Sequence, residues 1–193
     1  SVGAGPARIE VPPNGIPADG SAGRITPEMV TLAALTQDEL DRLVAQVPGG
    51  VRNVQDIYPL APLQEGILFH HLMAEDGDPY LLPSVYGFRQ REAVSRFVDT
   101  VQQVIGRHDI LRTAVYWEGL SQPVQVVQRE ARLELVELDA SDFGTADLAA
   151  ALEARFDPQH TRLDLGHAPL LRAHLVEDAR NGRWLLHILA HHL

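Results

Sequence analysis

The spacing of apolar residues predicts a chain of alternating helices and strands. Apolar residues recur at helical spacing in the segments 37–47, 62–73, 92–105 and 147–156. Short apolar or alternating runs of strand length lie at 83–88, 113–117, 124–127, 133–138, 170–176 and 184–190. Because the two kinds of segment are interspersed and no internal repeat is visible, the pattern predicts a mixed α and β fold.

The helical patterns also predict which side chains face the core. Helix 62–73 should direct Leu63, Ile67 and Leu68 inward. Helix 92–105 carries the longest apolar stripe of the chain, which consists of Val94, Phe97, Val98, Val101, Val104 and Ile105.

Local signals mark several boundaries. Thr36 and Glu39 have the spacing of a capping box at the start of a helix. Pro48-Gly49-Gly50 follows that helix and should end it. Asn181-Gly182 lies between two strand-like runs, which is a strong signal for a β-hairpin.

The amino-terminal residues 1–24 differ from the rest because Gly, Pro, Ala and Ser dominate them. Such a composition is typical of an extended interdomain linker. Order should begin near Thr26-Pro27, since Thr is a good N-cap and Pro suits the first helical position. We therefore predict a linker over 1–24 and one folded unit over 25–193.

Composition narrows the function classes. Hydrophobic residues make up 45% of the 193, which is enough for a medium-sized core. The absence of Cys excludes disulfides, thiolate metal sites and a Cys nucleophile. A net charge of −10 argues against binding to nucleic acid or to an anionic membrane surface. No run has the length of a membrane span and no signal peptide is visible, so we expect a cytoplasmic protein.

Histidine is the main candidate for chemistry. The chain has nine His residues, with adjacent pairs at His70-His71 and His191-His192. No Cys and no convincing set of carboxylates completes a metal site with them, so no metal is expected. No phosphate-binding Gly loop or nucleophile elbow is present either.

Two further motifs make the chain recognisable. Segment 56–68 reads DIYPLAPLQEGIL and resembles the first core motif of condensation domains from nonribosomal peptide synthetases. Segment 107–113 reads RHDILRT and resembles the second motif, RHxxLRT. The resemblance implies an α/β (α+β) fold, the amino-terminal lobe of a chloramphenicol-acetyltransferase-like architecture, with a mixed sheet and flanking helices. The preceding linker resembles the stretch that follows a carrier domain.

His191-His192 resembles the opening of the third motif of this family, HHxxxDG, and the chain stops at Leu193. The resemblance implies that His192 is catalytic and that His191 is a structural member of the motif. It also implies a chain truncated at this motif and inactive by itself. Without the resemblance, the plainer interpretation is that both residues simply end a strand.

Segment 70–78 reads HHLMAEDGD and fits HH[I/L]xxxxGD, which resembles the mark of dual epimerization/condensation domains. Adjacent helical residues point about 100° apart, so at most one of His70 and His71 faces a given cleft. In one interpretation, one of them assists epimerization; in the other, one packs in the core and its neighbour caps a turn. The two interpretations are left open.

Arg112 is the last candidate. In the family this Arg pairs with the Asp of the third motif and shapes the active site, but that Asp is not in this chain. A buried unpaired guanidinium is costly, so Arg112 should lie near solvent or another carboxylate.

The resemblance implies an enzyme that epimerizes a donor and joins it to an acceptor, for secondary metabolite or antibiotic biosynthesis. No cofactor would bind directly, because both substrates arrive as thioesters on phosphopantetheine arms. The partners would be upstream and downstream carrier domains and the carboxyl-terminal lobe. Alternatives are a condensation-only domain for a D-configured donor, a non-catalytic carrier-docking fragment, and an acyltransferase that uses soluble acyl-CoA.

Overall fold

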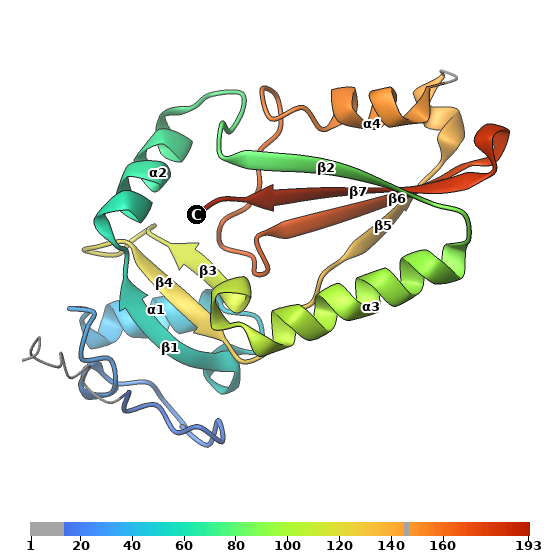
Figure 1. Cartoon of the computed structure of the whole chain (residues 1–193). Coiled ribbons are helices and arrows are strands. Elements are labelled where there is room, and N and C mark those ends of the chain that lie inside the picture. The colour runs from blue at the N-terminus through green and yellow to red at the C-terminus, as the bar shows by residue number, and fades with distance from the viewer. Residues whose placement is uncertain (1–13, 145–146) are drawn as a thin grey trace, which may run out of the picture.

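The chain forms two β-sheets with helices packed on them (Figure 1). The computed structural model describes residues 14–144 and 147–193. Short 3₁₀ helices connect several elements: η1 (Pro27–Met29), η2 (Gly50–Asn53), η3 (Asp109–Arg112), η4 (Ala140–Phe143) and η5 (Ala179–Asn181). None of the helices in these ranges is long and apolar enough to cross a membrane. The predicted mixed α and β fold is confirmed.

The first sheet has three antiparallel strands in the order β1 (Val54–Pro59), β4 (Val124–Gln128), β3 (Thr113–Tyr116). Helix α1 (Gln37–Gln46) shares one core with it, in which Leu40 and Leu43 join Ile57 and Val126. The predicted capping box at Thr36 is present with both of its hydrogen bonds. Strand β1 was not among the predicted strands.

The second sheet has four strands in the order β2 (Leu81–Phe88), β7 (Arg183–His191), β6 (Leu171–Asp178), β5 (Leu135–Leu138). Strands β5 and β6 are parallel and the other pairs are antiparallel, which confirms the predicted mixed sheet. Helix α3 (Arg91–Arg107) covers one face and helix α4 (Leu148–Arg155) covers the other.

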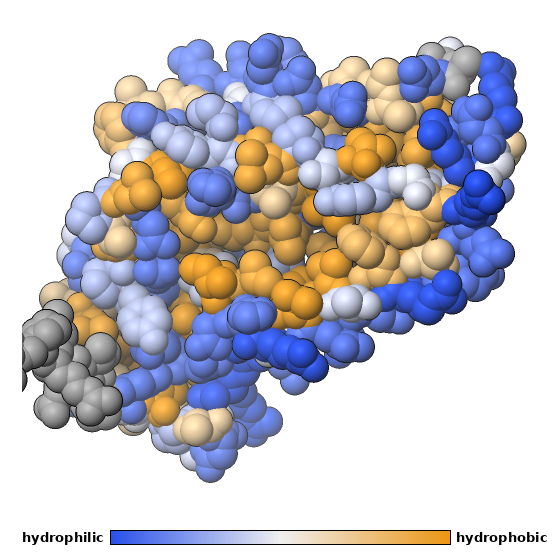
Figure 2. All heavy atoms as spheres, in the orientation of Figure 1, coloured by the Kyte–Doolittle hydropathy of each residue, from blue (hydrophilic) through white to orange (hydrophobic). Residues whose placement is uncertain are grey.

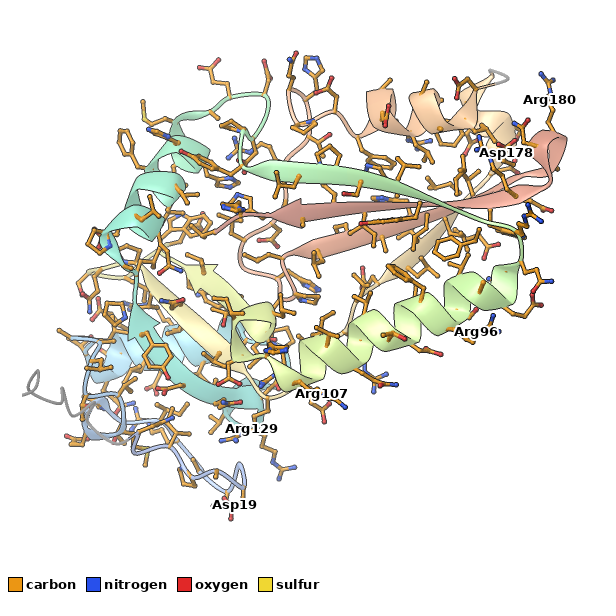
Figure 3. The ribbon with its side chains drawn as sticks, viewed as in Figure 1. Asp19, Arg96, Arg107, Arg129, Asp178 and Arg180 are labelled. Carbon is orange, nitrogen blue, oxygen red and sulfur yellow. The ribbon has the colours of Figure 1, made fainter. Side chains whose placement is uncertain are left out.

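Alternation along β6 and β7 separates the two faces. Leu175 and Leu186 pack with α3, whereas Val176 and Leu185 pack with α4. The β6–β7 hairpin at Asn181-Gly182 is confirmed, with Gly182 in the left-handed conformation at φ 60°. Asp178 closes the hairpin by accepting a hydrogen bond from Arg183 Nε at 2.8 Å. It lies at the end of the sheet far from the carboxyl terminus (Figure 3).

Two predicted core side chains are exposed instead. Helix α2 (Pro62–Met73) buries Ile67 and Leu68, but Leu63 in its first turn is 76% exposed. On α3, Val104 is 41% exposed, while Val94 and Ile105 are buried. Helical spacing identifies the apolar face, but it does not tell how far the neighbouring element extends along that face.

Residues 14–24, within the predicted linker, lie against the folded body, whereas 1–13 fall outside the described residues. Ile16 is buried in the core of the first sheet. Asn14 donates to the Gln55 carbonyl at 2.7 Å, and the Arg129 guanidinium donates to the carbonyls of Pro17 and Ala18. Figure 3 shows Arg129 next to this segment. Packed structure is therefore already present at Asn14, and not only from Thr26 onward as expected. The reason is that this extended segment buries the Ile16 side chain in the core.

A histidine pair joins β6 to β7 beneath α4, with His187 buried and His174 half-buried. His174 and His187 are register partners, and their Nδ1 atoms lie 3.3 Å apart. The ring of Phe156 stacks on His174 at 3.9 Å between centroids. Burial, followed by the nearby His187 ring and two arginines, lowers the pKa of His174 to about 4. Burial also lowers the pKa of His187.

This pair should make the fold sensitive to acid. An unfolded histidine titrates near pH 6.5, so the pair's full contribution is present above that pH and is lost as the pH falls toward 4. For His174 alone we expect a loss of about 2 kcal/mol of unfolding free energy between pH 8 and pH 5. Urea unfolding at both pH values would measure it. His174→Gln should reduce the loss, whereas His160→Gln, at an exposed histidine, should keep it; equal losses in all three proteins would contradict the interpretation.

Candidate active site

Three elements meet at the carboxyl-terminal end of β7. They are the last turn of α2 with His70 and His71, the loop before β2 with Asp78 and Tyr80, and the end of β7 with His191. The antiparallel pairing of β2 with β7 brings them together, since Leu81 is the register partner of His191. The two histidine pairs of the sequence therefore lie at one site.

Asp78 is the centre of this site. Its side chain is fully buried, and Oδ2 accepts hydrogen bonds from His71 Nδ1 at 2.5 Å and from His191 Nε2 at 2.9 Å. Oδ1 accepts from the Tyr80 N–H at 3.0 Å. Burial alone would raise the pKa of Asp78, but the bonds from His71 and Tyr80 and the nearby His191 hold it below its usual value. Asp78 is therefore a carboxylate and accepts at both oxygens.

His191 is a buried and neutral histidine. Its Nδ1 accepts a hydrogen bond from the Leu193 N–H at 3.0 Å, so the proton is on Nε2, which donates to Asp78. Burial lowers the pKa of His191 more than the Asp78 carboxylate raises it. With both ring nitrogens engaged inside the protein, His191 has no free nitrogen for a substrate.

His192 has the opposite environment. Its side chain is exposed, and its imidazole makes no hydrogen bond within the described part of the chain. The backbone is held, because the His192 N–H donates to the Tyr80 carbonyl at 3.0 Å. An exposed imidazole on a fixed backbone can exchange protons with a bound molecule.

The amino-terminal pair is divided in the same way. His71 is 5% exposed and lies edge-on to the rings of His191 and Trp117. His70 is exposed, and its Nδ1 lies 2.8 Å from the Tyr80 hydroxyl. His71 therefore packs in the core, and His70 is the member that an incoming molecule can reach. A role of the pair in epimerization stays a prediction.

The loop between the pair and Asp78 is fixed by its surroundings. The Arg162 guanidinium donates to the carbonyls of His71, Ala74 and Gly77. A Cβ on Gly77 would collide with the Gln159 carbonyl, so only glycine fits there. This explains the Gly-Asp end of segment 70–78: the glycine permits close approach and the aspartate reaches the histidines.

Comparison with known proteins identifies the family. The family model described as Condensation domain matches residues 54–193. This chain belongs to the condensation domain family. It is 51% identical over 183 residues to malpibaldin synthetase of Mortierella alpina, covering 95% of this chain and 3% of that protein. It is 33% identical over 130 residues to tyrocidine synthase 2 of Brevibacillus parabrevis, covering 66% of this chain and 4% of that protein.

Solved structures show the same fold. The starter condensation domain of rhizomide synthetase aligns with a TM-score of 0.55 at 22% identity, over 70% of this chain and 34% of that one. A four-domain nonribosomal peptide synthetase bound to AMP and glycine aligns with a TM-score of 0.57 at 18% identity, over 72% of this chain and 10% of that one. The predicted fold class is thereby confirmed. The chain spans about a third of the starter condensation domain that it matches.

Arg112 of this condensation domain lies away from the two histidine pairs. It ends η3 at the start of β3, whereas Trp117, which contacts His71, follows the other end of that strand. Its guanidinium is buried and donates to Asp109 Oδ1 at 2.5 Å, to Gln55 Oε1 at 2.9 Å and to the Gln128 carbonyl. The expectation that Arg112 lies near another carboxylate is confirmed. A role in shaping the active site stays a prediction.

One grouping of side chains was not predicted from the sequence. His71, Asp78 and His191 offer ligand atoms within 4.8 Å of one another, which is the spacing of a metal site. The spacing along the chain hid it, because Asp78 and His191 are 113 positions apart. However, Asp78 already contacts both rings at hydrogen-bond distance, and Nε2 of His191 carries its proton. The geometry is that of a hydrogen-bonded cluster rather than of ligands spread around an ion.

Proposed function

We propose that this chain is part of a condensation domain that inverts the Cα of a carrier-bound donor and then joins the donor to a carrier-bound acceptor. The observation that carries the proposal is the contrast at the end of β7. His191 is buried and fully bonded there, while the His192 imidazole is exposed and unbonded within the described part of the chain. This contrast matches the roles that the motif resemblance implies for the two residues.

In the condensation step, the acceptor amine attacks the donor thioester carbonyl. A C–N bond forms, the C–S bond breaks, and the amine loses a proton. We propose that the His192 imidazole receives this proton and returns it to the departing thiolate, since imidazole is the side chain best suited to take up and release a proton at neutral pH. Phosphopantetheine arms would hold both reactants, so binding removes much of the entropic barrier.

The epimerization step requires removal and return of the proton on the donor Cα. The fit of segment 70–78 to HH[I/L]xxxxGD supports it. Of the pair in that segment, His70 is accessible and His71 is not, so His70 is the member that can assist His192. Condensation of a D-configured donor without epimerization is the alternative for the same site.

The exposed apolar side chains support the expected partners. Leu63, Phe69 and Met73 are exposed on α2, which favours an interaction surface for a carrier domain. Figure 2 shows apolar side chains gathered in the middle of the face between α2 and α3. We propose that the carboxyl-terminal lobe covers this face in the complete domain.

Solvent exchange at the donor Cα tests the dual activity. The complete domain, with its upstream carrier loaded with an L-aminoacyl or L-peptidyl thioester, should incorporate deuterium from D₂O at that carbon. His192→Ala should abolish the incorporation. Loss in His70→Ala as well would give the amino-terminal motif a chemical role, whereas normal exchange would make that motif structural. No exchange in the wild type, with condensation intact, would contradict the dual function.

A further inference from the structure

The two histidine pairs are connected member by member through a single loop. Asp78 joins His71 to His191 by two side-chain hydrogen bonds to one oxygen. Tyr80 joins His70 to His192, since its hydroxyl lies 2.8 Å from His70 Nδ1 and its carbonyl accepts the His192 N–H. Asp78 also fixes the backbone of Tyr80, because Oδ1 accepts a hydrogen bond from the Tyr80 N–H. The aspartate thus connects all four histidines.

The position of His192 depends on which nitrogen of His191 carries the proton. A carboxylate can only accept, so Asp78 requires an N–H on His191 Nε2. Nδ1 is then left as an acceptor, and it binds the Leu193 N–H at 3.0 Å. The backbone on both sides of the His192 side chain is therefore held, by Tyr80 before it and by His191 after it.

We propose that Asp78 is a positioning residue of the active site, which sets the tautomer of His191 and thereby the orientation of His192. His71 is the second donor that keeps the buried carboxylate in place. This inference rests on the proposed function of His192. If the inference is right, segment 70–78 affects the reaction through its buried residues His71 and Asp78, which position His192. This effect does not depend on the role of His70.

Asp78→Asn separates positioning from folding. The amide has nearly the same shape, but it replaces one acceptor oxygen by a donor NH₂, so it cannot accept from both rings and Tyr80 together. We expect kcat for peptide bond formation to fall about 10- to 100-fold, which is the usual effect of removing a residue that orients a functional side chain. KM for both carriers should change less than about threefold. Asp76→Asn is the matched control, because it makes the same change at an exposed position of the same loop.

A conservative rescue adds a second test. The Asn side-chain NH₂ can take the place of a histidine Nδ1–H, so His71→Asn should retain most of the kcat. His71→Phe keeps a ring but has no donor, and it should lose kcat in the same range as Asp78→Asn. Equal activity of the two His71 variants would contradict a role as donor.

The decisive experiment combines kinetics with side-chain ¹⁵N NMR of histidine-labelled complete domain. We expect a neutral His191 with its proton on Nε2 in the wild type, a changed tautomer in Asp78→Asn, and a melting temperature that still shows a folded protein. Full kcat in folded Asp78→Asn, or the proton on Nδ1 in the wild type, would overturn the inference. Stoichiometric zinc binding to the wild type that Asp78→Asn abolishes would overturn it in favour of a metal site. If His192→Ala keeps full activity, the proposed function fails instead, and the NMR result still reports on Asp78.

Discussion

His192→Ala in the complete condensation domain is expected to lower the rate of peptide bond formation by about 10²- to 10⁴-fold. The reason is the position of the imidazole: it is exposed, has no partner in the described part of the chain, and extends from a backbone fixed by Tyr80. Removing it takes away the proposed proton acceptor but breaks no side-chain hydrogen bond within residues 14–144 and 147–193. A single-turnover assay with both carriers loaded would measure the effect.

The matched control for this prediction is His160→Ala, which removes an exposed imidazole elsewhere on the surface. It should leave the rate within about twofold of wild type, and the melting temperatures of both variants should stay close to that of wild type. A folded His192→Ala domain that forms peptide at the wild-type rate would show that the group receiving the proton lies elsewhere.

Arg112→Ala is expected to lower the free energy of unfolding by about 3 kcal/mol. The Arg112 guanidinium is buried and satisfies the Gln55 side chain and the Gln128 and Arg129 carbonyls, which would lose their donor. Urea unfolding of the complete domain would measure the change. The control is Arg96→Ala, since Arg96 is exposed on α3 (Figure 3). This substitution should change the free energy of unfolding by less than about 0.5 kcal/mol.

The outcome at Arg112 also distinguishes two roles for the second motif. A large loss of stability would make Arg112 an organiser of the three-stranded sheet. If Arg112→Ala instead unfolds like wild type but loses activity, the motif would act in the active site, as the family resemblance implies. Arg112→Lys should recover little stability, because one ammonium cannot replace a guanidinium that spans several acceptors.

The sequence predicted most elements because periodicity reports directly on burial. Strand β1 was missed for a local reason: its register shifts between Val54 and Asp56, and its buried residues are Val54 and Ile57. Such a β-bulge destroys the alternation on which strand prediction relies. Val104 and Leu63 were wrongly placed in the core. Helical spacing predicts which face of a helix is apolar, but it does not predict whether another element packs against every residue of that face.

The arrangement of the candidate site was foreseen only in part, for a similar reason. Motif resemblance located both histidine pairs, and helical geometry required His70 and His71 to diverge. Neither the motifs nor the helical geometry revealed that Asp78 bridges the two histidine pairs, because that contact depends on the pairing of β2 with β7. The match of segment 70–78 already contained the aspartate, but only the fold shows what it contacts.

The most direct test of the dual function is the configuration of the product. The complete domain is given an L-configured donor on the upstream carrier and an L-aminoacyl acceptor on the downstream carrier. The peptide is released after one turnover and its donor residue is analysed by chiral chromatography. A product with a D-configured donor residue is the predicted result. A product that retains only the L configuration would contradict the dual epimerization and condensation activity proposed for this chain.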